Sequence, residues 1–105
     1  MRKASSRAEV VSFEQIPNVG SSIADDFRSI GMESPEQLVG HDPLKIYQAI
    51  CDQSGSFHDP CVLDVVMSAV DFMNGAQPKK WWDYTKQRKS NHTDFVNRLR
   101  QQYAR

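Results

Sequence analysis

The residues best suited to binding chemistry form a short turn before a predicted helix: Asn18, Val19, Gly20, Ser21 and Ser22. Pro17 fixes φ at the start of the turn, and Gly20 accepts the positive φ that other residues resist, so the chain can reverse direction here. The first amides of a helix have no partner inside it, and the helix dipole places a partial positive charge beside them. Anions bind at such amides. The turn is therefore predicted to bind a phosphate group.

A packing role for the same turn is left open. Apolar residues recur through it at helical spacing, and they would hold two helices together: Ile16, Val19, Ile23, Phe27 and Ile30. The helix behind the turn also carries Asp25 and Asp26, where a phosphate site would be better served by lysine or arginine. Ser22 and Asp25 have the spacing of a capping box, which would start this helix.

The segment from Ile16 to Gly31 resembles the helix-hairpin-helix motif, in which an apolar residue, proline, any residue, an apolar residue and glycine precede a helix. In proteins with that motif, the hairpin amides and the following helix hold a nucleic-acid phosphate. The resemblance implies the same role for residues 18–22.

A second candidate surface is both aromatic and basic: Lys79, Lys80, Trp81, Trp82, Lys86, Arg88 and Lys89. Exposed aromatic rings can stack on bases while lysines bind phosphates. Alternatively, one or both tryptophans cover the end of the preceding helix. Neighbouring side chains on a helix point in different directions, so at least one tryptophan is expected in the core.

Two thiols and an imidazole lie close together in the sequence, at Cys51, His58 and Cys61. They could bind zinc, with His41 or Asp59 as a fourth ligand. Structural zinc usually has two closely spaced pairs of ligands, whereas this sequence has one. We expect buried, reduced cysteines instead, with no metal, no cofactor and no catalysis. A Cys61 thiolate would be stabilised if the residue starts a helix.

Charge is distributed unevenly along a chain whose formal net charge is zero. Residues 13–78 hold ten acidic and two basic side chains, and residues 79–105 hold two acidic and eight basic ones. The two blocks either neutralise each other across the fold or leave the basic one free to bind an anion.

The elements that position these groups are predicted to be helices, and no segment has the pattern of a strand. Ser34-Pro35, Asp42-Pro43 and Asp59-Pro60 each pair a capping side chain with a proline suited to the first helical position. The run from Cys61 to Met73 is almost entirely apolar and should form the central helix. Its polar residues form one narrow stripe that is expected to face solvent: Asp64, Ser68 and Asp71.

We therefore expect an all-α, SAM-like domain of two tandem helix-hairpin-helix units. Residues 1–9 should be a disordered basic arm, residues 10–84 the domain, and residues 85–105 a basic C-terminal extension ending in a helix capped by Asn91. A short helix is expected over residues 10–16. No apolar run approaches the roughly 18 residues of a membrane span, no secretory signal is evident, and a cytoplasmic location is expected.

Four blocks occur in an order that resembles one bacterial family, the pathogenicity locus family, some of whose members are labelled mitomycin resistance proteins. The blocks are IPNVGSSIADDFRSIG, DPLKIYQAIC, GSFHDPCVL and KWW. A further similarity is to the C-terminal domain of TfoX-type competence regulators. The resemblance covers Phe13 to about Tyr84 and implies a tandem-hairpin fold and a role around DNA. A non-catalytic protein that binds nucleic acid without sequence specificity is the leading hypothesis, and a module for binding other proteins is the alternative.

Overall fold

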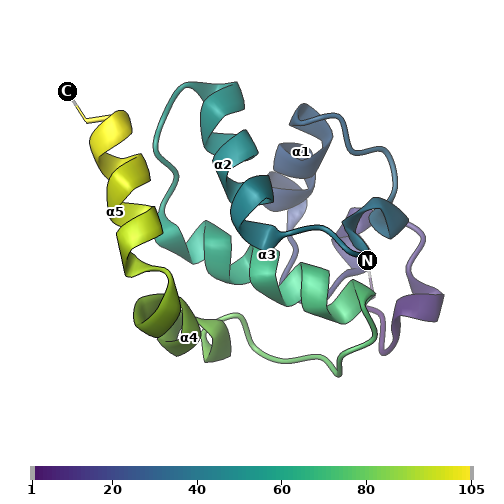
Figure 1. Ribbon diagram of the computed structural model, residues 1–105. Coiled ribbons are helices and arrows are strands. Elements are labelled where there is room, and N and C mark those ends of the chain that lie inside the picture. Colours follow the sequence, from purple (N-terminus) through teal and green to yellow (C-terminus); the bar gives the residue numbers. More distant parts are fainter. Residues whose placement is uncertain (1, 105) are drawn as a thin grey trace.

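Helix α3, Pro60–Met73, is the element on which the other helices pack in the computed structural model, which describes residues 2–104 (Figure 1). Ten of its 14 residues are buried. The carboxylate of Asp59 accepts a hydrogen bond from the amide of Cys61 at 2.8 Å and caps the start of the helix. The predicted central helix and its Asp-Pro start are thus confirmed.

The remaining helices flank α3 on two sides (Figure 1). Helices α1, Ser21–Ser29, and α2, Pro43–Ser54, lie on one side. Helix α4, Asp83–Asn91, lies against α3 on the other side. Helix α5, Thr93–Gln102, runs back from α4 past the start of α3 toward α2, with which it shares a buried cluster (Figure 1). Three short 3-10 turns complete the fold: η1 Arg7–Glu9, η2 Phe13–Gln15 and η3 Pro35–Leu38. No strand occurs in residues 2–104, so the all-α prediction is confirmed.

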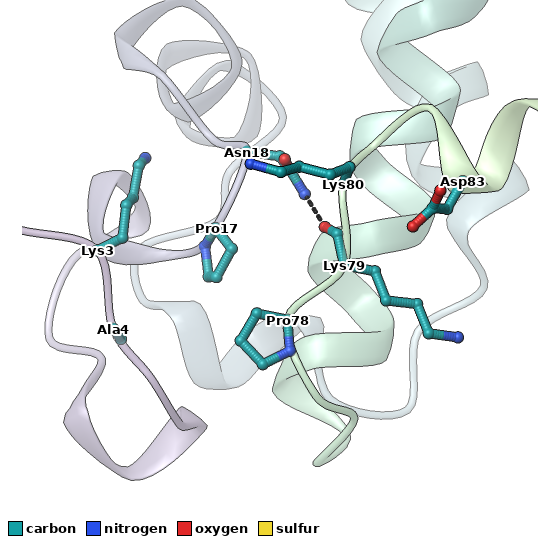
Figure 2. A pocket seen from close by; sticks show the side chains of 8 residues that line it. All are labelled: Lys3, Ala4, Pro17, Asn18, Pro78, Lys79, Lys80 and Asp83. Carbon is teal, nitrogen blue, oxygen red and sulfur yellow. Dashed lines mark hydrogen bonds between the residues drawn. The ribbon is translucent and has the colours of Figure 1, made fainter.

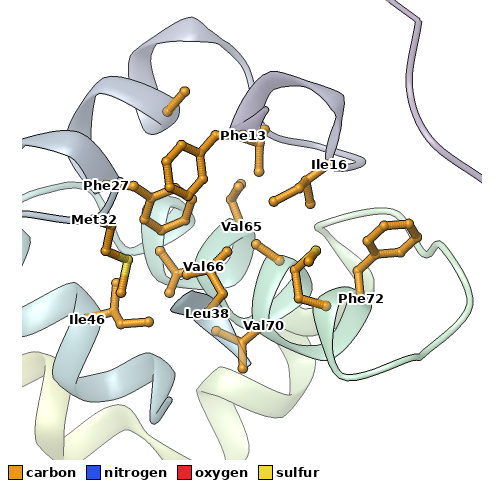
Figure 3. Close-up of a cluster of buried hydrophobic side chains, with 14 of the residues drawn as sticks. Phe13, Ile16, Phe27, Met32, Leu38, Ile46, Val65, Val66, Val70 and Phe72 are labelled. Carbon is orange, nitrogen blue, oxygen red and sulfur yellow. The ribbon is translucent and has the colours of Figure 1, made fainter. Parts of the chain in front are cut away.

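The main core joins α3 to the hairpin region of the chain (Figure 3). The rings of Phe13 and Phe27 lie 5.2 Å apart between their centroids, and Ile16 and Val19 are fully buried beside them. A second cluster joins α2 to the C-terminal helices: Tyr47, Cys51, Leu63, Met67, Tyr84, Val96 and Leu99. The apolar residues of the hairpin turn therefore pack against α3, which is the packing role left open for this turn.

The polar stripe on α3 does not face solvent as expected. Asp71 is exposed, but Asp64 is 0% and Ser68 3% exposed. Helix α4 brings polar partners over this side, because Arg88 and Thr85 both donate hydrogen bonds to the Asp64 carboxylate. The expectation was wrong because polar partners from elsewhere in the chain cover these residues: α4 covers Asp64, and Asn18 bonds Ser68.

The N-terminal segment lies against the domain where a disordered arm was expected. Ala4 is buried, and its amide donates to the carbonyl of Gln15 at 2.8 Å. The guanidinium of Arg7 donates to the carbonyl of Met73 at 2.9 Å. Residues 1 and 105, which belong to the expected arm and extension, lie outside the described residues.

Two helix predictions differ from the structure. The helix expected over residues 10–16 is only the turn η2, because Ser12 is extended and the side chain of Gln15 accepts from the amides of Val11 and Ser12. The terminal helix expected to start at a cap on Asn91 is α5, whose N-cap is His92, because Asn91 is the last residue of α4. None of the helices in the described part of the chain is long and apolar enough to cross a membrane.

Candidate nucleic-acid interface

The predicted hairpin is a tight turn that leads directly into α1. The amide of Val19 donates to the carbonyl of Ile16 at 3.1 Å and closes the turn. Asn18 holds the positive φ, 73°, which was expected at Gly20. Gly20 itself is extended, with φ of −92°, and is the N-cap of α1. Asparagine supplies the left-handed residue here because it tolerates that conformation better than most side chains.

Three of the five predicted phosphate-binding residues keep their backbone donors available. Gly20, Ser21 and Ser22 are exposed, and their amides donate to no group within residues 2–104. No side chain caps α1, so the capping box expected from Ser22 and Asp25 is not formed. The Val19 amide is occupied within the turn and Asn18 is only half-exposed, so the exposed donors lie at residues 20–22.

The side chain of Asn18 joins the turn to two distant parts of the chain. Its amide nitrogen donates to Ser68 Oγ on α3 at 2.8 Å and to the carbonyl of Lys79 at 2.7 Å. The second bond, drawn in Figure 2, spans 61 positions of sequence. Asn18 therefore brings the predicted hairpin site and the predicted basic site together.

A groove of about 470 Å³ lies where these segments meet (Figure 2). Three lysines and one carboxylate are among its eight lining residues: Lys3, Ala4, Pro17, Asn18, Pro78, Lys79, Lys80 and Asp83. In Figure 2, the side chain of Lys80 extends toward Asn18, whereas that of Lys79 extends away from Asn18, on the side where Asp83 lies. The groove thus has an excess of positive charge.

Lys3 is the residue of this groove that the sequence analysis missed. Its ammonium group donates to the carbonyls of Glu14 at 2.8 Å, Ile16 at 3.2 Å and Val19. Partial burial lowers the pKa of Lys3, and the nearby Glu14 carboxylate opposes that effect. The three carbonyls fix the ammonium group against the hairpin. The basic character of the first residues was the only feature of the sequence that pointed to it.

The two tryptophans have different surroundings. Trp81 is half-buried against the main core, whereas Trp82 is 55% exposed. Their rings meet edge to face, with centroids 5.5 Å apart. The ammonium groups of Lys79 and Lys80 lie over the rings of Tyr84 and Trp82 at 5.9 and 5.7 Å. Trp82 does not line the groove itself, but it is in contact with Lys80, which does.

The three remaining basic residues of the predicted surface differ in exposure. Arg88 Nε donates to Asp64 Oδ1 at 2.7 Å, and its side chain is only 12% exposed, so it is not available to an external phosphate. Lys86 and Lys89 are exposed on α4 and form no ion pair within residues 2–104. These two lysines can extend the basic surface beyond the groove.

Carboxylates close to the hairpin are partly neutralised. Arg28 donates to Glu14 at 2.8 Å and to Asp25 at 3.1 Å. The guanidinium of Arg28, through its hydrogen bonds, lowers the pKa of Glu14. The repulsion expected from the acidic side chains of α1 is thereby reduced.

The thiols and the imidazole of the zinc hypothesis do not form a site. No group of three histidine, cysteine, aspartate or glutamate side chains suited to a metal occurs in the described residues. Instead, His58 Nε2 lies 2.9 Å from Ser54 Oγ, and Cys51 is buried. Burial raises the pKa of both thiols, and the Asp59 carboxylate raises that of Cys61 further. The stabilised thiolate expected for Cys61 is therefore wrong.

Cys61 should react slowly with iodoacetamide at neutral pH. Because its pKa is raised, the reactive thiolate is a smaller fraction than in free cysteine, whose pKa is about 8.5. The rate should increase with pH beyond the point at which free cysteine levels off. Mass spectrometry of a Cys51→Ala variant, with free cysteine as the reference, measures this. Labelling faster than the reference at pH 7 would contradict the assignment.

Asn18 can be tested by two substitutions that separate its side chain from its backbone conformation. Asn18→Gly removes two hydrogen bonds, and each contributes about 1 kcal/mol. Asn18→Ala removes the same bonds and also places alanine at positive φ, which costs roughly 1 kcal/mol more. The free energy of unfolding measured in urea should therefore be highest for wild type, lower for Asn18→Gly and lowest for Asn18→Ala. The reverse order of the two variants would contradict the left-handed assignment.

Together, the fold and the groove define a small all-helical protein with a lysine-lined groove beside a hairpin turn. The chain belongs to the pathogenicity locus family, whose model matches residues 6–90. It is 44% identical over 72 residues to "Mitomycin resistance protein McrB" of Streptomyces lavendulae, and the match covers 69% of each chain. The resemblance to the pathogenicity locus family is thus confirmed. No solved structure matches the chain.

Proposed function

We propose that this protein binds nucleic acid without sequence specificity and without catalysing a reaction on it. The free amides of residues 20–22 would receive one phosphate, and Lys79 and Lys80 would bind phosphates along the same strand. The observation that carries the proposal is the hydrogen bond from Asn18 to the Lys79 carbonyl, which holds the basic segment beside the hairpin. These elements together would form a helix-hairpin-helix interface.

The distribution of charge supports the proposal. The body of the chain, residues 13–78, is acidic, so an extended anion is attracted mainly where basic side chains gather. Backbone amides and lysine ammonium groups recognise phosphate oxygens, which are the same at every nucleotide. Such contacts position a strand but do not read its bases. Binding should therefore depend on charge rather than on sequence.

A salt titration tests the proposal. The affinity of the intact protein for a fluorescein-labelled 20-nucleotide DNA, measured by anisotropy, should fall linearly in a plot of log K against log salt concentration. For the two phosphates that Lys79 and Lys80 would neutralise, the slope is about −1.4 to −1.8, which gives a loss of roughly 7- to 12-fold between ~50 and ~200 mM salt.

Two oligonucleotides of unrelated sequence should give the same curve. If no complex forms at about 20 mM salt, the proposal fails, and the protein-binding alternative becomes the better account of the same scaffold. A pronounced preference for one sequence would contradict recognition through phosphates alone.

A further inference from the structure

We infer that the groove is built for a single strand of nucleic acid, one base of which stacks on Trp82. The inference rests on the proposed function and adds the form of nucleic acid that is bound. Three large hydrophobic side chains are strongly exposed in the described residues: Val11, Val39 and Trp82. Trp82 is the aromatic one among them. An exposed tryptophan ring beside a lysine-lined groove is a platform for an unpaired base.

The Trp82 ring is held in place before any ligand arrives. Trp81 packs against the main core and meets the Trp82 ring edge to face at an interplanar angle of 82°. The backbone around it is fixed as well, because the amide of Asp83 donates to the carbonyl of Lys80 and that of Thr85 donates to the carbonyl of Trp82. Little conformational entropy is therefore lost when a base stacks on the ring.

A phosphate-binding group accompanies the ring. The ammonium of Lys80 lies 5.7 Å from the centroid of Trp82. Lys80 also lines the groove with Lys79 and Asn18. A base that stacks on this face of Trp82 would displace the ammonium group from the ring, and Lys80 would then lie next to the phosphate of the same nucleotide.

The surroundings favour a strand over a duplex. In a duplex the faces of the bases are stacked on each other and are not available to a protein ring. A duplex also carries one negative charge per ~1.7 Å of its length. The carboxylate of Asp83 lines the groove, so a rigid duplex laid along the lysines would be placed against this negative charge. A flexible strand can follow the lysines and avoid it.

The test compares one 20-nucleotide strand with the duplex of the same sequence, using anisotropy at low salt and the intact protein. Wild type should bind the strand at least several-fold more tightly than the duplex. Trp82→Ala should weaken binding of the strand by roughly 10-fold, a loss typical of one stacked base, and leave binding of the duplex unchanged. Trp82→Phe retains an aromatic face and should restore most of the affinity.

Val39→Ala is the matched control, because Val39 is 42% exposed but does not line the groove. It should change neither affinity. Equal affinities for strand and duplex, or a loss in Trp82→Ala that is the same for both, would overturn the inference and leave the proposed function standing. If neither nucleic acid binds, both fail. Circular dichroism of each variant establishes that it is folded, and the preference of the wild type for the strand over the duplex decides the matter should Trp82→Ala unfold.

Discussion

The double substitution Lys79→Glu/Lys80→Glu is expected to lower the affinity for DNA by about 100-fold at ~50 mM salt. Each phosphate contact contributes roughly 0.7 to 0.9 to the slope of log K against log salt concentration. Loss of one contact therefore lowers the affinity by about 10-fold at this salt concentration. The slope should therefore also become shallower by about 1.5. Both side chains are exposed, and Asn18 bonds the carbonyl rather than the side chain of Lys79, so the fold should be retained.

A matched control separates the groove from the total charge. Lys45→Glu/Arg98→Glu makes the same change in net charge at two exposed positions that do not line the groove. It should retain most of the affinity, and its salt slope should stay close to that of wild type. Should the two double variants lose affinity equally, binding would follow from net charge alone, and the groove would have no special part in it.

The second large effect concerns stability, and it comes from the buried ion pair between α3 and α4. Arg88→Met leaves the Asp64 carboxylate, which is 0% exposed, without its charged partner. Removal of one member of a buried pair costs about 3 to 5 kcal/mol. In a domain of this size, the melting temperature should fall by roughly 15 °C or more. The loss arises because a charge is left without water or a counter-charge, whereas the hydroxyl of Thr85 donates only one hydrogen bond to it.

Two further variants identify the cause of that loss. Lys86→Met makes the same kind of change on α4 at an exposed side chain, and it should be within about 0.5 kcal/mol of wild type. Asp64→Leu/Arg88→Met removes both charges and should recover most of the stability, because buried pairs replaced by apolar residues are often no less stable. If the double variant were as unstable as Arg88→Met, the packing of the arginine stem rather than the unpaired charge would explain the effect. Thermal melts by circular dichroism provide these numbers.

The helix starts were predictable because their causes are local. The carboxylates of Asp42 and Asp59 accept from the amides two residues later, and each is followed by a proline that needs no hydrogen bond at that position. Ser34 and Gln37 likewise form the expected capping box, although the helix that follows is only the turn η3. The apolar run of α3 can be buried only at the centre of so small a domain, so its central position also follows from sequence.

The candidate site was only partly predictable for a similar reason. The hairpin was evident from Pro17 and the apolar spacing, and the basic cluster was evident from composition. No local pattern indicated that the two lie side by side, because a hydrogen bond across 61 positions depends on how the helices pack. Lys3 was missed for the same reason, since its three carbonyl partners are 11 to 16 residues away.

The sequence by itself determined the helical class, the central helix, the caps at Asp42 and Asp59 and the family of this protein. The tertiary structure alone decided that Asp64 is buried and that Arg88 forms an ion pair with it instead of lying on the surface. It also decided that Lys79 and Lys80 lie beside the hairpin. Caps and apolar periodicity act over a few residues, so they can be identified in the order of the chain. A charge, in contrast, binds the nearest opposite charge in space, and that neighbour is fixed only when the helices have packed.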